Sequence, residues 1–282
     1  MTAASPAAGG GSAGGMRPPA PSPAPIPEAA PTPDVIPIPD VIPTPAEIRA
    51  LHERHAPSAE MLDLVHTHCA IVWSIAEQLL DRSGADADRD LVRAGCLLHD
   101  VGVYRLYDGT GRRVHDSYLL HGVLGHELLG GEGLPEVLRR FCSRHTGVGL
   151  TRHDILAQRL PLPAGDYVAV TTEERLVMYA DKFHSKTTPP RFLTADAYAG
   201  HVRRFGEDKV AAFAALRAEF GEPDLRELAR VHGHALATRA ESEEAGPAPA
   251  GHADEAVGEA GPGDAGAGTP GGNRSPDAPV TG

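Results

Sequence analysis

Six residues of types that commonly bind metal ions fall where helices would bury them. Each lies on the apolar face of a predicted helix; His68, for example, comes three residues after Val65, and Asp181 comes four after Val177. A single imidazole at such a place is more often a hydrogen-bonded core residue, but six buried polar groups are costly unless one partner compensates them together. The pattern predicts that these side chains converge as metal ligands: His68, His99, Asp100, His121, His145 and Asp181.

The adjacent pair His99 and Asp100 indicates what chemistry such a site would perform. Two metal ions about 3.5–4 Å apart share a bridging carboxylate and a bridging water, and they lower the pKa of that water until it becomes hydroxide at neutral pH. Asp100 is the predicted bridge and the predicted catalytic residue, with one carboxylate oxygen on each ion. Histidine and carboxylate ligands without thiolate favour iron, manganese or cobalt over zinc.

The elements that must position these ligands are predicted to be helices. Apolar spacings of three and four, together with Ser58, Asp88 and a Thr171–Glu174 capping box as start signals, define most of them. Residues 103–117 are predicted to form a polar loop that acts as a lid, and the best strand candidate is 167–170. The predicted helices span about 46–55, 58–82, 91–100, 119–129, 135–145 and 171–186, with others that begin at 194, 207 and 223.

Composition divides the chain into three parts. Residues 1–45 are a Pro/Gly/Ala-rich tail and residues 241–282 an acidic tail, both predicted to be disordered, and residues 46–240 form one predicted folded domain. The tails carry most of the net charge of −12, which leaves about −3 on the folded part. No basic run favours long nucleic acid and no apolar run is long enough for a bilayer. Three cysteines are expected to be buried thiols in a cytoplasmic protein.

The ligand pattern resembles the HD-domain superfamily of metal-dependent phosphohydrolases. His68, His99-Asp100 and Asp181 match its H…HD…D signature, and HDVG at 99–102 is similar to the HDIG subset. The resemblance extends over about residues 64–185. It implies an all-α fold, an HD-domain helical bundle, with further helices after the HD core.

Three further segments extend the resemblance to the HDIG subset. HGVLGHELL at 121–129 is similar to that subset's second histidine helix, and RHTG at 144–147 and YADK at 179–182 are similar to its last ligand segments. The pair His121 and His145 is what two-metal members possess and one-metal members lack. The resemblance therefore implies two divalent metal ions.

The resemblance implies hydrolysis of a small phosphoester, such as a nucleotide or a related compound. Many relatives carry Lys or Arg directly after HDIG, where Val103 stands here. This departure implies either that Arg105 takes over that phosphate contact or that the substrate is different. The full set of expected substrate-binding residues is Arg105, His126, Arg144 and Lys182.

Two other functions use the same fold. Some HD-fold proteins hold a di-iron pair that activates oxygen, and redox behaviour would separate such an oxygenase from a hydrolase. A non-catalytic signalling module is the third alternative, although such modules generally lose ligands and this chain keeps all six. The sequence leaves the substrate and the oligomeric state open.

Overall fold

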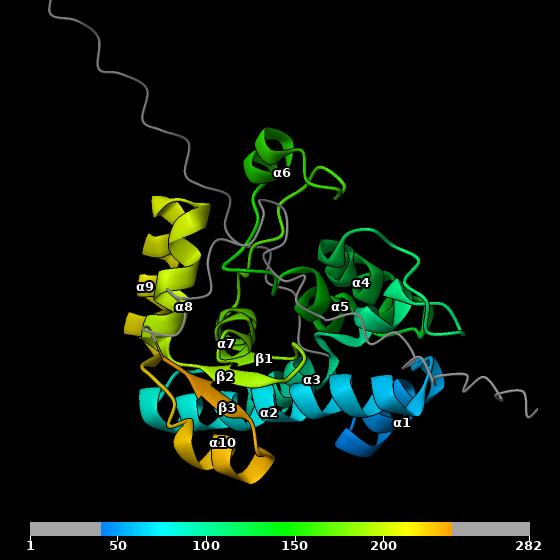
Figure 1. Ribbon diagram of the computed structural model, residues 1–282, viewed down its shortest axis with the longest axis horizontal. Helices are drawn as coiled ribbons and strands as arrows, with labels where there is room; N and C mark the ends of the chain where they lie inside the picture. The colour runs from blue at the N-terminus through cyan, green and yellow to red at the C-terminus, as the bar shows by residue number, and fades with distance from the viewer. Residues whose placement is uncertain (1–40, 239–282) are drawn as a thin grey trace, which may run out of the picture. The chain divides into compact units, whose positions relative to one another are not determined.

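The computed structural model describes residues 41–238, and within them the predicted all-α fold is confirmed. The predictions of disorder for the two tails fall almost wholly on 1–40 and 239–282, outside the described residues. Figure 1 shows the helices with one small sheet. The α-helices are α1 (Pro45–His55), α2 (Ala59–Ser83), α3 (Arg89–Leu98), α4 (His121–Gly131), α5 (Glu136–Ser143), α6 (Arg152–Gln158), α7 (Thr172–Asp181), α8 (Ala195–Val202), α9 (Glu207–Phe220) and α10 (Arg226–His232).

Three short 3₁₀ helices and three short strands complete the described fold. The 3₁₀ helices are η1 (Val101–Leu106), η2 (Tyr118–Leu120) and η3 (Arg203–Phe205), and the strands are β1 (His184–Ser185), β2 (Arg191–Leu193) and β3 (Ala235–Ala237). Strand β2 is central, antiparallel to β1 and parallel to β3. Strands of two or three residues are too short to show alternation in a sequence, so the sheet was not predicted.

Side-chain caps begin the helices that carry the candidate ligands. The Ser58 hydroxyl accepts a hydrogen bond from the Met61 amide at the start of α2, and the Asp88 carboxylate does the same for two amides of α3. Thr171 and Glu174 form the reciprocal capping box of α7. All three caps were predicted. They fix where each helix begins, and therefore which residue it presents at a given turn.

The core holds the ligand-bearing helices against one another. Helix α2 packs against α3 and α7, and α5 packs against α3, α4 and α7. A buried ion pair also joins α5 to α7, because the Arg140 guanidinium donates to the Glu174 carboxylate at 3.0 Å. The three cysteines are buried and free, as predicted. As a result, five helix segments lie close together in the core: the middle of α2, the C-terminal ends of α3, α5 and α7, and the start of α4.

The predicted polar loop at 103–117 is wrong over its first residues. Residues 101–106 form the 3₁₀ helix η1, in which Val103, Tyr104 and Leu106 are buried in the core. The Tyr104 hydroxyl bonds to His52 Nδ1 at 2.8 Å, and His52 Nε2 donates to the Leu97 carbonyl at 2.7 Å. The apolar residues of this segment therefore anchor it to α1 and α3.

The predicted strand at 167–170 is also wrong. Only a single bridge, between Tyr167 and Leu150, occurs there in the described structure. Four residues flanked by loops offer no second apolar partner strand, so the segment pairs at one point and continues into the α7 cap.

Gly102 marks the closest approach between two backbone segments near the candidate site. A Cβ at this position would lie 2.0 Å from the His121 carbonyl oxygen and 2.3 Å from the Gly125 amide nitrogen. The sequence predicted a glycine that permits a sharp exit from a helix. The structure gives a different reason, because the residue lets η1 pass directly over the first turn of α4.

We expect Gly102→Ala to destabilise the fold by about 3 kcal/mol, since the added methyl group would displace backbone atoms that cannot rotate away. The midpoint of urea unfolding measures this loss. Gly109→Ala is the matched control, because nothing lies within 4 Å of a Cβ there. Equal midpoints for the two variants would contradict the close approach of η1 and α4.

Candidate metal centre

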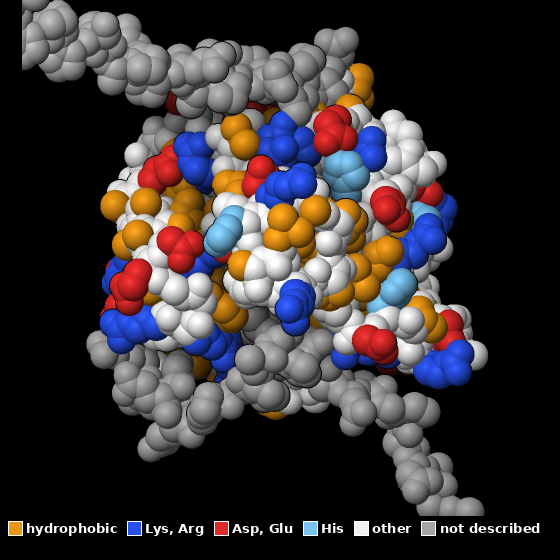
Figure 2. Space-filling view, turned by 90° about the horizontal axis from the view of Figure 1, so that it is seen from above, with side chains coloured by type: hydrophobic (Ala, Val, Ile, Leu, Met, Phe, Trp, Pro, Cys, Tyr) orange, Lys and Arg blue, Asp and Glu red, His pale blue; other side chains and the backbone are white. Residues whose placement is uncertain are grey.

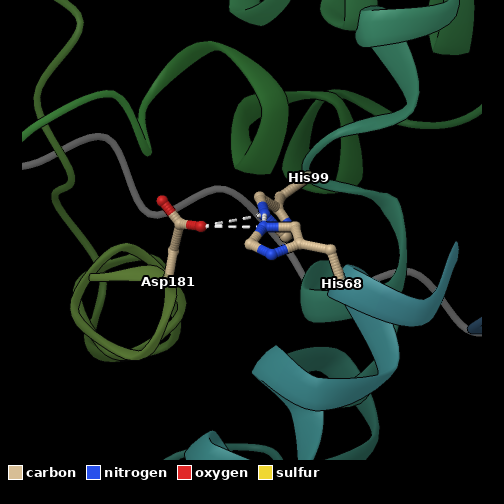
Figure 3. A group of neighbouring side chains, drawn as sticks. All are labelled: His68, His99 and Asp181. Atoms are coloured by element: carbon tan, nitrogen blue, oxygen red, sulfur yellow. Dashed lines mark hydrogen bonds and ion pairs between the residues drawn. The ribbon is translucent and has the colours of Figure 1, made fainter. Parts of the chain in front are cut away.

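Three of the predicted ligands form one compact group. His68 comes from the middle of α2, His99 directly follows α3, and Asp181 is the last residue of α7; Figure 3 shows the two imidazoles pointing toward the carboxylate. The Asp181 Oδ1 atom lies 3.0 Å from His68 Nε2 and 3.4 Å from His99 Nε2. Both rings are almost fully buried. Two imidazoles and one carboxylate at these separations could hold a metal ion.

A second group lies on the other side of Asp100. His121 begins α4 and His145 follows α5, and their Nε2 atoms are 2.9 Å apart. The Asp100 Oδ1 atom is 3.5 Å from His121 Nε2 and 3.7 Å from His145 Nε2. The structure therefore brings together all six residues that the sequence selected.

Asp100 stands between the two groups with one oxygen toward each. Its Oδ2 atom lies 3.3 Å from His68 Nε2, whereas Oδ1 faces His121 and His145. The residue is completely buried, and neither oxygen has a hydrogen-bond donor of normal geometry among the described residues. A buried carboxylate without such donors is costly, so its surroundings must supply positive charge.

Main-chain carbonyls fix the tautomers of three ligand imidazoles. The Nδ1 atoms of His99, His121 and His145 lie 2.8, 2.6 and 3.0 Å from carbonyl oxygens of Cys96, Tyr118 and Phe141, respectively. A carbonyl only accepts, so each Nδ1 carries the proton and donates it. When the rings are neutral, their Nε2 lone pairs all point inward. A cation is the partner that such an arrangement fits.

The electrostatics of the cluster favour the metal-binding protonation states of His68, Asp100 and Asp181. For His99, burial lowers the pKa, but Cys69, Asp100 and Asp181 outweigh burial and hold that pKa well above its usual range. Burial, followed by the nearby Lys186 ammonium, lowers the pKa of His68 to about 4. Burial alone would raise the pKa of Asp100, but Lys186 and the surrounding imidazoles hold it well below its usual range. Burial opposes ionisation of Asp181 in the same way, and Lys182 with the two imidazoles lowers its pKa. Charged carboxylates and a neutral imidazole are the forms that coordinate metals.

Two residues that the sequence did not single out belong to this cluster. The Lys186 ammonium forms an ion pair with Asp100 Oδ2, and it also lies 5.5 Å from the centre of the Tyr118 ring. His184 Nδ1 lies 2.9 Å from His68 Nδ1. Both lie within the predicted helix 171–186, but α7 ends at Asp181, so that prediction is wrong over its last residues and helical spacing did not point to these side chains.

Among the predicted substrate-binding residues, Lys182 contacts the candidate ligand segments directly. Lys182 is buried, and its ammonium donates to the His145 carbonyl at 2.9 Å and to Asp181 Oδ2 at 2.7 Å. It therefore supports two ligand segments. Its role as a phosphate contact stays a prediction.

The contacts of the other three predicted substrate-binding residues are with residues other than the candidate ligands. Arg105 is exposed and lines a surface pocket of about 270 Å³ with α4 residues such as Leu124 and Glu127. His126 Nδ1 lies 3.2 Å from the Ser143 hydroxyl, and Arg144 donates to the Val168 carbonyl at 3.1 Å. Substrate contact by these residues also stays a prediction.

No helix within residues 41–238 is both long and apolar enough to cross a membrane. Figure 2 shows acidic and basic side chains mixed over the face that it presents, without a basic cluster there.

Comparison with known proteins finds one family model that is similar to this part of the chain. The family model of the HD domain matches residues 65–186. The tRNA (cytidine(56)-2'-O)-methyltransferase of Picrophilus torridus is 36% identical over 123 residues, which are 44% of this chain and 32% of that protein. An uncharacterized protein of Methanocaldococcus jannaschii is 36% identical over 117 residues, 40% of this chain and 62% of that one. The matched part of the chain thus spans about one third of the length of the first relative and less than two thirds of the length of the second.

Two solved structures of the HD domain of the L. monocytogenes phosphodiesterase PgpH were also found. The one in complex with cyclic-di-AMP is 20% identical, covers 70% of this chain and 90% of that chain, and has a TM-score of 0.35. The other is 18% identical, with a TM-score of 0.34. The family match begins three residues before His68 and ends five after Asp181, so it includes the whole cluster. Residues 65–186 thus match the HD-domain family model, and all six predicted ligands fall inside that match.

Proposed function

We propose that the protein is a metal-dependent hydrolase of small phosphoesters. The observation that supports this most directly is the position of Asp100, whose two buried oxygens face two separate groups of imidazole ligands. A carboxylate placed in this way is suited to bridging two divalent ions. The proposal assigns His68, His99 and Asp181 to one ion, His121 and His145 to the other, and Asp100 to both.

The bound ions would supply a water of lowered pKa as nucleophile and a positive field for the phosphate. The residues of this chain then have distinct tasks. Asp100 holds the two ligand groups at a fixed separation. The carbonyls that accept from His99, His121 and His145 keep the inward nitrogens unprotonated and the rings correctly oriented. The buried setting excludes bulk water and strengthens each electrostatic contact.

Lys186 is the side chain best placed to bind a phosphate oxygen in this site. Its ammonium is nearly buried and paired with Asp100 Oδ2, which is the oxygen that we assign to the first ion. A cation on Asp100 would compete with this ammonium and leave it to pair with an anionic substrate beside the cluster. We propose this role for Lys186, while Lys182 holds the segments of Asp181 and His145.

We expect Lys186→Met to lower kcat/KM by about 100-fold, the usual loss when one charged donor to a transition-state oxygen is removed. Metal content should stay at the wild-type level or rise, because a cation that competes for Asp100 has gone. Lys182→Met is the comparison, and it should lower metal content because its ammonium holds the ligand segments of His145 and Asp181 in place. Metal loss in Lys186→Met would show instead that the ammonium supports the ligands.

The proposed function is tested by loading the purified protein with Mn²⁺, Co²⁺ or Fe²⁺ and assaying a panel of phosphoesters. The panel should include nucleoside monophosphates, cyclic nucleotides, dinucleoside polyphosphates and sugar phosphates, with Asp100→Ala as the blank. Release of phosphate or of a phosphomonoester only in the wild type supports hydrolysis. Oxygen uptake with a mixed-valent Fe(II)/Fe(III) signal, and no phosphoester cleavage, would favour the di-iron oxygenase instead.

A further inference from the structure

His68 differs from the other ligand imidazoles in what its outer nitrogen contacts. His99, His121 and His145 each donate Nδ1–H to a carbonyl three or four residues earlier in the chain. His68 lies in the middle of α2, where the carbonyls of the preceding turn already serve the helix. Its Nδ1 atom instead lies 2.9 Å from Nδ1 of His184, which is 116 residues later.

His184 continues this contact toward the surface. Its Nε2 atom lies 3.0 Å from Nδ1 of His234, and the three rings stack, with centroids 5.2 Å apart at each step. His68 and His184 are buried, whereas His234 is partly exposed. The three imidazoles therefore form one continuous chain from the cluster to the edge of the described structure.

We propose that His184 and His234 are positioning residues that fix the tautomer and orientation of His68 for the first metal ion. This inference rests on the proposed metal centre and extends it to His234, which lies beyond the end of the HD match at residue 186.

The hydrogen-bonding capacity of the rings permits one arrangement when a metal is bound. A metal on His68 Nε2 requires the proton to be on Nδ1, which donates to His184 Nδ1. His184 must then carry its proton on Nε2 and donate it to His234 Nδ1. With its proton on Nε2 and directed to His234, the His184 ring has a free lone pair on Nδ1 with which to accept from His68.

The small sheet explains how His234 reaches this position. His184 pairs with Phe192 across β1 and β2, and Phe192 pairs with Leu236 across β2 and β3. The Phe192 ring contacts both imidazoles, with centroids 4.8 Å from His184 and 5.9 Å from His234. The sheet thus holds the outer imidazoles against one buried aromatic ring. Its function in this proposal is to support a ligand on α2.

The test measures metal affinity at the first site alone. In a His121→Ala background, which weakens the second site, His184→Phe should reduce Mn²⁺ affinity by about 10- to 100-fold, the usual effect of losing an outer hydrogen-bond partner of a ligand. His184→Asn should restore affinity to within a few-fold, because its Oδ1 atom occupies the place of Nδ1 and accepts from His68. His234→Ala should lose only a few-fold, since water can replace a partly exposed ring.

His232→Ala is the matched control. Its ring also lies near Phe192 and His234, but among the described residues it makes no hydrogen bond to His68, His184 or His234. Isothermal titration with Mn²⁺ provides the affinity, and circular dichroism checks the fold. The inference is overturned if His184→Asn binds as weakly as His184→Phe while folded, or if His232→Ala loses as much as His234→Ala. If the wild type takes up no metal at all, the proposed function fails first.

Discussion

Replacing Asp100 with asparagine is expected to reduce phosphoester turnover by about 10³-fold and to lower the affinity for both metal ions. The physical reason is its position, since its two oxygens face His68 on one side and His121 on the other. An amide has nearly the same volume but no charge, and its nitrogen cannot coordinate. The loss of a pre-positioned charge at the reacting centre accounts for an effect of this size. Steady-state kinetics with metal analysis of the same preparation measure both.

Three controls make the Asp100 result specific. Circular dichroism should show an intact fold, because the substitution preserves packing. Asp100→Ala should behave like Asp100→Asn, which separates loss of charge from any effect of the new amide. Glu127→Gln, an exposed carboxylate on α4, should keep full activity. Retention of two tightly bound ions in Asp100→Asn would remove its bridging role.

Replacing His121 with alanine is expected to reduce metal content from about two ions per chain to about one. His121 and His145 provide both imidazoles of the second group, so a single imidazole would remain with Asp100. Turnover should fall strongly, because a bridging water needs both ions. Inductively coupled plasma mass spectrometry after dialysis gives the metal content, and Mn²⁺ titration gives the affinity of the ion that stays.

His126→Ala serves as the comparison for His121→Ala because it lies on the same helix and contacts Ser143 on α5. It should bind as much metal as the wild type. His68→Ala should also leave about one ion, held by the opposite group, and the double variant His68→Ala/His121→Ala should hold neither firmly. Metal content in His121→Ala equal to that of the wild type would exclude His121 as a ligand.

The helical fold and the convergence of the ligands could be predicted because both depend on local rules. Helical spacing placed His68 and Asp181 on inward faces, and the caps at Ser58, Asp88 and Thr171 set the register of those faces. An inward polar residue carries its own signal, since burial without a partner is unfavourable. For this reason six residues spread over 113 positions could be expected to meet.

The supporting residues could not be predicted because their positions depend on long-range packing. Lys186 and His184 follow the end of α7 in an irregular segment, and only the pairing of β1 with β2 directs them to the cluster. His52 is on the face of α1 that meets η1, a segment whose apolar residues were taken for a polar loop. No pattern in the sequence distinguishes these side chains from surface lysines and histidines.

The inward-facing nitrogen lone pairs and the buried Asp100 carboxylate, which pairs with the Lys186 ammonium, have a consequence for how long the protein survives in a cell. Binding of ions to the native state alone would add about 2.7 kcal/mol of stability at a hundred times the dissociation constant. Unfolded chains are removed by proteases, so abundance follows stability. The amount of this protein would therefore rise and fall with the supply of its metal, even when its synthesis is constant.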